Sequence, residues 1–231
     1  MTGPEQWRTM EVFAGLADEA LAESVLDLPS AEVGAGQEYA VAAGGAACCL
    51  VARGRLALTV FAEENRERTI GILEQGDVLV RPLAGWAATG PRVRCFAIDD
   101  AVLGLVDDAR IERWMEHPAL ARSLFAVMAQ QIAERELAVA IALEPRVERR
   151  LLLKLRQLAG RWGRVTPDGV RLDLRLTHQE LANMVGSARE SVTIALGRLA
   201  ESGEIEVRNR SLLIRHEVPA PGADEGRTTP V

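Results

Sequence analysis

The spacing of apolar residues changes twice along the chain. Over residues 7–28 apolar residues recur at helical spacing before Pro29, which predicts one or two short helices. From about residue 33 to residue 106, glycines alternate with short apolar runs, and residues 48–53, 56–62 and 68–73 are typical of strands. Residues 63–66 are polar and predict a hairpin turn. Short strands at this spacing predict a small antiparallel sandwich or barrel.

A long helix is predicted next, beginning with Pro118 at its first position. Glu144-Pro145 ends it, because a residue before proline avoids the helical region. A parallel pair of such helices across a two-fold axis would bury its apolar stripe, and the alternative is packing on the β domain of the same chain. The stripe consists of Leu120, Leu124, Val127, Met128, Gln131, Arg135, Ala138 and Ile141.

Two short capped helices follow near the C-terminus. Thr177 and Glu180 have capping-box spacing, and Ser187 and Glu190 repeat it, so helices should begin at residues 178 and 188. Gly186 between them permits a tight turn. This is the helix-turn-helix pattern, although capped helix pairs also occur in bundles that bind no DNA. The residues expected to pack the pair are Leu181, Ala182, Val185, Val192, Leu196 and Leu199.

The second of these helices is the candidate recognition helix. Arg189, Glu190 and Thr193 lie near its N-terminal end, which meets base edges when such a helix enters the major groove. Arginine can bind guanine with two bonds, a carboxylate can accept from cytosine, and Ser191 can bond a phosphate. Glu204–Arg208 and Ser211–Arg215 then alternate as a hairpin, a predicted wing. The remaining DNA-binding candidates are Thr177, His178 and Ser187 at the helix starts and Arg208 and Arg210 in the wing.

Charge is unevenly distributed along the 231 residues. Residues 1–145 carry 12 Lys/Arg and 22 Asp/Glu, a net −10, whereas residues 146–216 carry 14 and 8, a net +6. The tail, residues 217–231, carries 1 and 3. A basic C-terminal segment that follows an acidic N-terminal segment favours a DNA-binding domain in the basic segment. A helix is expected over residues 146–159, ended by Gly160, and the Pro/Gly-rich tail is expected to be disordered.

The rest of the composition narrows the class of protein. No secretory signal or membrane-spanning run is found, so we expect a cytoplasmic protein with no membrane partner. Cys48 and Cys49 would face opposite sides of a strand. With Cys95 they are interpreted as core residues, and a redox sensor is the alternative. No nucleotide-binding or hydrolase motif occurs, and residues 30–110 lack histidine, so we expect neither an enzyme, a metal site nor a cofactor.

Nearly the whole chain resembles the Crp-Fnr family of regulators. The match is strongest in Leu-Thr-His-Gln-Glu-Leu-Ala (residues 176–182), Val-Gly-Ser-Ala-Arg-Glu-Ser-Val-Thr (185–193) and Leu-Gly-Arg-Leu (196–199), and looser over residues 49–77. The resemblance implies a homodimer held by the central helix, an effector-binding β-roll and a winged DNA-binding domain. It implies that Arg189 and Glu190 read bases and that Ser191 contacts the backbone. Ile194 stands where many members carry a second arginine, so a thymine-methyl contact becomes possible there.

The effector segment departs from the members that bind cyclic nucleotides. Those show Phe-Gly-Glu, whose carboxylate holds the ribose, followed by an Arg-Ser/Thr-Ala segment at the phosphate. This chain has Leu79-Val80-Arg81 and then Arg92-Val93-Arg94, so a buried ribose would lack its partner. Arg81, Arg92 and Arg94, with Trp86, are the candidate pocket residues for a different anion, and a solvated basic patch is the alternative. Three cysteines cannot supply a four-cysteine iron–sulfur site.

The sequence therefore predicts an α+β protein in four parts. These are an N-terminal antiparallel β-roll (residues 1–110), a central dimerisation helix (111–144), a winged helix-turn-helix (145–216) and a tail (217–231). The predicted function is regulation of transcription by a homodimer on a pseudo-palindromic double-stranded operator, without response to cyclic AMP. RNA polymerase and an unidentified small molecule are candidate partners. The alternatives are a constitutive DNA binder with a vestigial β scaffold and a cysteine-based redox regulator.

Overall fold

The computed structural model describes residues 7–40, 46–61, 67–80, 92–172, 174, 176–208 and 211–215. The chain folds as two compact units, Met1–Ala140 and Ile141–Val231. The division falls a few residues before Glu144-Pro145, where the sequence predicts a boundary. The predicted hairpin turn at residues 63–66 and the tail lie outside the described residues.

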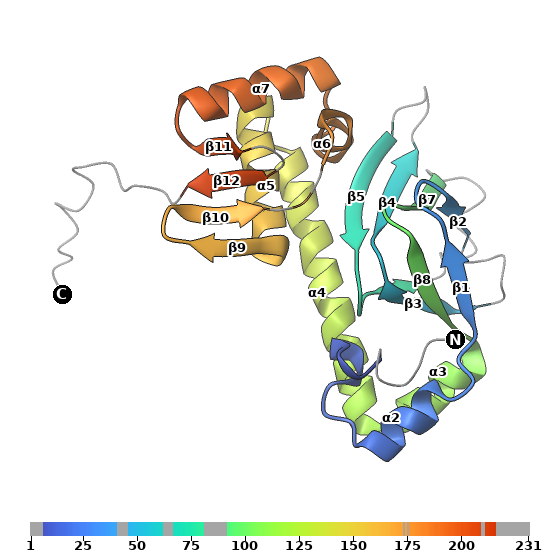
Figure 1. Ribbon diagram of the computed structural model, residues 1–231. Helices are drawn as coiled ribbons and strands as arrows, with labels where there is room; N and C mark the ends of the chain where they lie inside the picture. The colour runs from blue at the N-terminus through green and yellow to red at the C-terminus, as the bar shows by residue number, and fades with distance from the viewer. Residues whose placement is uncertain are drawn as a thin grey trace, which may run out of the picture. The chain divides into compact units, whose positions relative to one another are not determined.

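Two antiparallel sheets form the body of the first unit (Figure 1). One sheet has the order β1-β8-β3-β6 and the other β2-β7-β4-β5. An apolar cluster that includes Leu56, Leu103 and Cys95 draws on strands of both sheets, so the two sheets form a sandwich. The strands are β1 Ser30–Val33, β2 Glu38–Tyr39, β3 Cys48–Arg53, β4 Leu56–Phe61, β5 Glu67–Leu73, β6 Val78–Val80, β7 Arg92–Ala97 and β8 Ala101–Val106. The antiparallel β domain and the three predicted strands are confirmed, each strand to within one residue.

Alternation along β3 separates the two adjacent cysteines. Cys49 belongs to the cluster between the sheets. Cys48 belongs to a second cluster on the opposite side, where Trp7, Phe13 and Trp114 pack edge to face. The prediction that the two thiols face opposite sides of a strand is confirmed, and both side chains serve as buried core residues.

Short helices close the second cluster. They are the 3-10 turn η1 Glu11–Phe13, α2 Asp18–Val25 and α3 Asp108–Met115. Asp107 caps α3 by accepting a hydrogen bond from the Arg110 backbone N–H at 2.8 Å. The Trp114 indole N–H donates to the Ser24 carbonyl at 3.1 Å, which ties α3 to α2. The prediction of one or two short helices over residues 7–28 is thus confirmed by η1 and α2, whereas α3 was not predicted.

The long helix α4 is Pro118–Ala142, as predicted from its proline start and its proline stop. Its predicted stripe divides, however. Leu120, Leu124 and Val127 are buried in the second cluster of their own unit, and the Gln131 amide donates to Asp77 at 3.3 Å. Assigning this stripe to a helix pair is therefore wrong for its first half, because the β domain needs that apolar face as its own cover.

A second stripe of α4 faces solvent instead. Phe125 is 76% exposed, Ile132 52% and Val139 62%, and Met128 is also exposed. These four residues and half-buried Arg135 stand at positions 125, 128, 132, 135 and 139, spaced alternately by three and four residues, which is the spacing of a coiled-coil seam. A large apolar stripe in water is unfavourable for an isolated chain.

The described residues of the second unit after α4 form helices and a sheet of strand order β11-β12-β10-β9 (Figure 1). Its elements are α5 Val147–Trp162, β9 Gly163–Thr166, β10 Gly169–Leu172, α6 His178–Val185, α7 Arg189–Glu201, β11 Ile205–Arg208 and β12 Ser211–Arg215. The predicted helix end at Gly160 is wrong, and the β9–β10 hairpin was not predicted. A Cβ at Gly160 would meet nothing within 4 Å, whereas one at Gly163 would lie 2.3 Å from the Ala159 carbonyl oxygen. Gly163 is therefore the glycine that the helix end requires.

Candidate nucleic-acid interface

A complete capping box opens α6. The Thr177 hydroxyl accepts from the Glu180 N–H at 3.1 Å, and the Glu180 carboxylate accepts from the Thr177 N–H at 2.6 Å. Gly186 ends the helix in the left-handed conformation, with φ 61°. The predicted start, turn and end of the first helix are confirmed. Thr177 has a structural task in this box, in addition to its predicted place near phosphates.

The start of α7 differs from the prediction. Its first residue is Arg189 and its N-cap is Ala188, so the predicted second capping box of Ser187 with Glu190 is wrong. Alanine has no side-chain oxygen, and the first-turn N–H groups of α7 therefore lack an N-cap side chain. Ser187 instead lies in the turn, where its N–H donates to the Ala182 carbonyl at 3.0 Å.

Opposite faces of α7 differ sharply in exposure. The face toward the unit's interior is buried, as are the apolar residues of α6, so the predicted packing of the helix pair is confirmed. Arg189, Glu190 and Thr193 of the predicted site are exposed, and Ser191 is half-buried beside them. The exposed face continues with Ile194 and Arg198.

Two candidate DNA-binding residues are bonded to each other. His178 Nδ1 lies 2.8 Å from Thr193 Oγ1, and that hydroxyl donates to the Arg189 carbonyl at 3.0 Å. The first residue of α6 is thereby attached to the second turn of α7. The sequence analysis missed this pairing because the partners are 15 residues apart.

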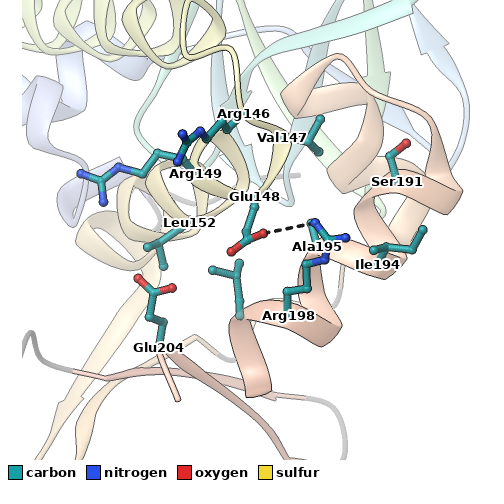
Figure 2. Close-up of a pocket in the computed structure, with 11 residues that line it drawn as sticks. Arg146, Val147, Glu148, Arg149, Leu152, Ser191, Ile194, Ala195, Arg198 and Glu204 are labelled. Atoms are coloured by element: carbon teal, nitrogen blue, oxygen red, sulfur yellow. Dashed lines mark ion pairs between the residues drawn. The ribbon is translucent and has the colours of Figure 1, made fainter. Parts of the chain in front are cut away.

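A cavity of about 570 Å³ lies between the start of α5 and α7. Figure 2 shows Ser191, Ile194 and Arg198 of α7, together with Arg146, the N-cap residue of α5, and Arg149 of α5. Arg198 lies 3.8 Å from the Glu148 carboxylate, an exposed ion pair that adds little stability. The sequence analysis missed the contribution of α5, because only the fold brings residues 146–149 beside α7.

The predicted wing is the β11–β12 hairpin. Arg208 pairs with Ser211 in the strand register. Arg210 and the side chain of Arg208 lie outside the described residues. Their phosphate contacts therefore stay predictions.

Comparison with known proteins identifies the family. The model of the Crp-like helix-turn-helix domain matches residues 146–217, which contain the cavity and both helices. The regulatory protein CysR of Synechococcus elongatus is 30% identical over 161 residues, covering 68% of this chain and 71% of that protein. This chain belongs to the Crp-Fnr family. It is a Crp-Fnr-type transcription regulator with a helix-turn-helix DNA-binding domain.

Similarity to other members extends over most of this Crp-Fnr regulator. A CRP-like cAMP-activated global transcriptional regulator of Mycobacterium tuberculosis is 26% identical over 212 residues, covering 88% of this chain and 91% of that protein. A CooA mutant from Carboxydothermus hydrogenoformans has a TM-score of 0.71 at 23% identity, covering 89% and 90% of the two chains. FixK2 from Bradyrhizobium japonicum has a TM-score of 0.63 at 18% identity, covering 81% and 92%. The predicted α+β fold class is confirmed.

The candidate effector residues of this Crp-Fnr regulator are only partly visible. Arg81 and Trp86 and the side chain of Arg92 lie outside the described residues. Arg94 binds Glu38 through one edge of its guanidinium, with Nε donating to Oε1 at 2.7 Å and Nη2 donating to Oε2. That guanidinium also lies 4.8 Å from the ring centres of Phe61 and Phe96.

Glu38 changes the expectation for Arg94. The hydrogen bond from Arg94 lowers the pKa of the Glu38 carboxyl, so the partner stays charged. Arg94 also alternates along β7 with buried Cys95, which places it on the face away from the core cluster. Its charge is already compensated, and an anion at Arg94 would have to displace Glu38.

The cysteines lie in poor surroundings for thiolate chemistry. Burial raises the pKa of Cys48 and of Cys95 to about 12, and burial also raises the pKa of Cys49. Cys49 Sγ lies 3.5 Å from the Tyr39 hydroxyl. Because the thiolate is the reactive form, these shifts favour the core interpretation over the redox alternative. Within the described residues no cluster of side chains could hold a metal ion, and no helix is long and apolar enough to span a membrane.

Proposed function

We propose that this regulator is a homodimer that binds a pseudo-palindromic operator, with α7 of each chain in the major groove. The proposal rests on the exposed face of α7. Arg189 and Glu190 stand in its first turn and face solvent, while Val192, Leu196 and Leu199 hold the helix from behind. A recognition helix needs this arrangement, because its N-terminal residues must reach base edges while the opposite face stays anchored.

The exposed side chains match the chemistry of base readout. Arg189 would donate two bonds to O6 and N7 of one guanine, and Glu190 would accept from N4 of a cytosine. Ser191 and the uncapped first-turn N–H groups would bind phosphate, together with Arg208 and Arg210 of the wing. Arg146 and Arg149 add positive charge at the start of the neighbouring α5. Base contacts then set specificity, and phosphate contacts set register and salt dependence.

The exposed stripe of α4 supports the dimer. Phe125, Met128, Ile132 and Val139 present apolar side chains at coiled-coil spacing to solvent. A second copy related by a two-fold axis offers the same stripe and would bury both. The two α7 helices would then meet half-sites about one helical turn apart.

The sequence of the effector segment supports insensitivity to cyclic AMP. Arg81 replaces the carboxylate that a buried ribose needs, and Arg94 is engaged by Glu38. Any effector would shift the DNA-binding equilibrium only by binding one arrangement of the dimer better than another. A constitutive binder is the alternative, and it predicts full operator affinity with no ligand added.

Selection of operator DNA tests the proposal. The purified full chain is used to enrich binders from a random double-stranded pool at fixed salt, with and without cyclic AMP. We expect an inverted repeat whose half-sites are centred about 10 base pairs apart. It should be enriched equally with and without cyclic AMP. Enrichment of a single asymmetric half-site would contradict the dimer, and no enrichment above the pool would contradict sequence-specific binding.

A further inference from the structure

We propose that Ile194 reads DNA sequence directly, by packing against the 5-methyl group of one thymine in each half-site. This inference deepens the proposed function and rests on it. Ile194 is 57% exposed, although it is a large apolar residue in a helix of 13 residues. We assign the base-reading role to Ile194 because it is exposed between polar residues of the same helix face, and not because of its exposure alone.

Ile194 occupies the centre of the exposed face of α7. Glu190 lies one helical turn before it and Arg198 one turn after it, and both are exposed. Packing of the helix is supplied by the opposite face, where Val192, Ala195 and Leu196 are buried. Exposed Ile194 is therefore not needed to pack α7 against the rest of its unit.

Gly197 gives this face a second unusual feature. It is exposed within α7, and a Cβ built on it would meet nothing within 4 Å. Glycine destabilises a helix interior relative to alanine, and packing among the described residues does not require it here. Because Gly197 has no side chain, a binding partner could approach the backbone of α7 more closely beside Ile194. Thr193, the other neighbour, already has its hydroxyl bonded to the Arg189 carbonyl.

The major groove offers one apolar group at base edges, the thymine methyl. Opposite any other base, Ile194 would cover a donor or acceptor without replacing its bond to water. Ile194 also lines the cavity of about 570 Å³, beside Ser191 and Arg198 (Figure 2). The contact therefore favours thymine over the other three bases at a single position.

Replacing thymine by uracil removes only this methyl group and tests the contact atom by atom. Each thymine of the selected operator is changed to deoxyuridine in turn, symmetrically in both half-sites, and affinity is measured by fluorescence anisotropy. For the wild type we expect one sensitive position, with roughly fourfold weaker binding per half-site, the effect of burying one methyl group. For Ile194→Ala we expect weaker binding to thymine DNA and no further loss with uracil at that position.

Val165→Ala is the matched control, since Val165 is an equally apolar exposed residue, 78% exposed on β9. It should keep the uracil effect of the wild type. Uniform tolerance of uracil by the wild type, or an undiminished uracil effect in Ile194→Ala, would overturn the inference while leaving operator binding intact. Failure of the wild type to prefer the operator over random DNA would instead overturn the proposed function.

Discussion

His178 Nδ1 lies 2.8 Å from Thr193 Oγ1, which joins the start of α6 to α7, the proposed recognition helix. Because the Thr193 hydroxyl donates its proton to the Arg189 carbonyl, the imidazole Nδ1 is the donor in the first bond. The pair therefore holds the first turn of α7, including Arg189, against α6. We infer that it fixes the recognition helix before DNA arrives, which lowers the cost of ordering it on binding.

Thr193→Val should therefore weaken operator binding by about fivefold, since a net hydrogen bond contributes about 1 kcal/mol. Thr193→Ser keeps the hydroxyl and should bind like the wild type. In a double-mutant cycle with His178→Ala, measured by anisotropy, the two losses should be less than additive. Full additivity would mean that the two residues act separately.

Arg189→Ala should cost about 1–3 kcal/mol of operator affinity and relax the preference at one base pair, because a bidentate contact to guanine is lost. Affinity for random DNA should change much less. Arg113→Ala on α3 removes the same charge from an exposed site in the other unit and should leave specificity unchanged. Equal losses on operator and random DNA for Arg189→Ala would assign that side chain to phosphate.

Ile132→Asp should convert the proposed dimer to a monomer, because it puts two charges among the apolar side chains Phe125, Met128 and Val139 of the seam. Ala133→Asp adds the same charge one residue further along α4, at a position outside the predicted seam, and should remain dimeric. Sedimentation velocity at micromolar concentration distinguishes the two masses. A dimeric Ile132→Asp variant would exclude the exposed stripe as the interface.

The buried thiols predict the pH dependence of stability. The pKa of Cys48 and of Cys95 rises from 9.0 to about 12 on folding, so the native state holds these protons longer than the unfolded chain does. Their stabilising contribution is complete below pH 9 and is lost as pH rises toward 12, by about 1.4 kcal/mol per pH unit for each thiol. Urea titrations between pH 8 and 11 should show this slope.

The matched variant in that experiment is Cys48→Ala combined with Cys95→Ala, which should show a shallower decline. Operator affinity of the wild type should be the same with and without reductant. A reductant-dependent affinity would restore the redox alternative.

Most of the fold could be predicted from local sequence signals. Capping-box spacing at Thr177 and the prolines around α4 mark element ends directly, because they act within one turn of the backbone. Gly160 does not end α5, since a glycine marks a helix end only where the fold requires a close approach. That approach occurs at Gly163, against Ala159 and Val170, and depends on a hairpin that folds back from later in the chain.

Contacts between distant residues could not be predicted from the pattern. Both stripes of α4 are apolar, and only the fold decides that Leu120 and Leu124 cover the β domain while Phe125 and Ile132 face solvent. Arg94 was predicted to be available to an anion, yet its partner Glu38 lies 56 residues away on β2. The exposed residues of α7 could be predicted from sequence, because exposure and order along one helix follow from its period alone.

The central claim is sequence-specific DNA binding through α7. Its most direct test is a titration of the wild-type protein, at one fixed salt concentration, against the selected operator and a scrambled duplex of equal length and composition. We expect the operator to bind at least about 10³-fold more tightly, within the usual range for specific regulators, and Arg189→Ala to remove most of that ratio. Equal affinity of the wild type for both duplexes would contradict the account.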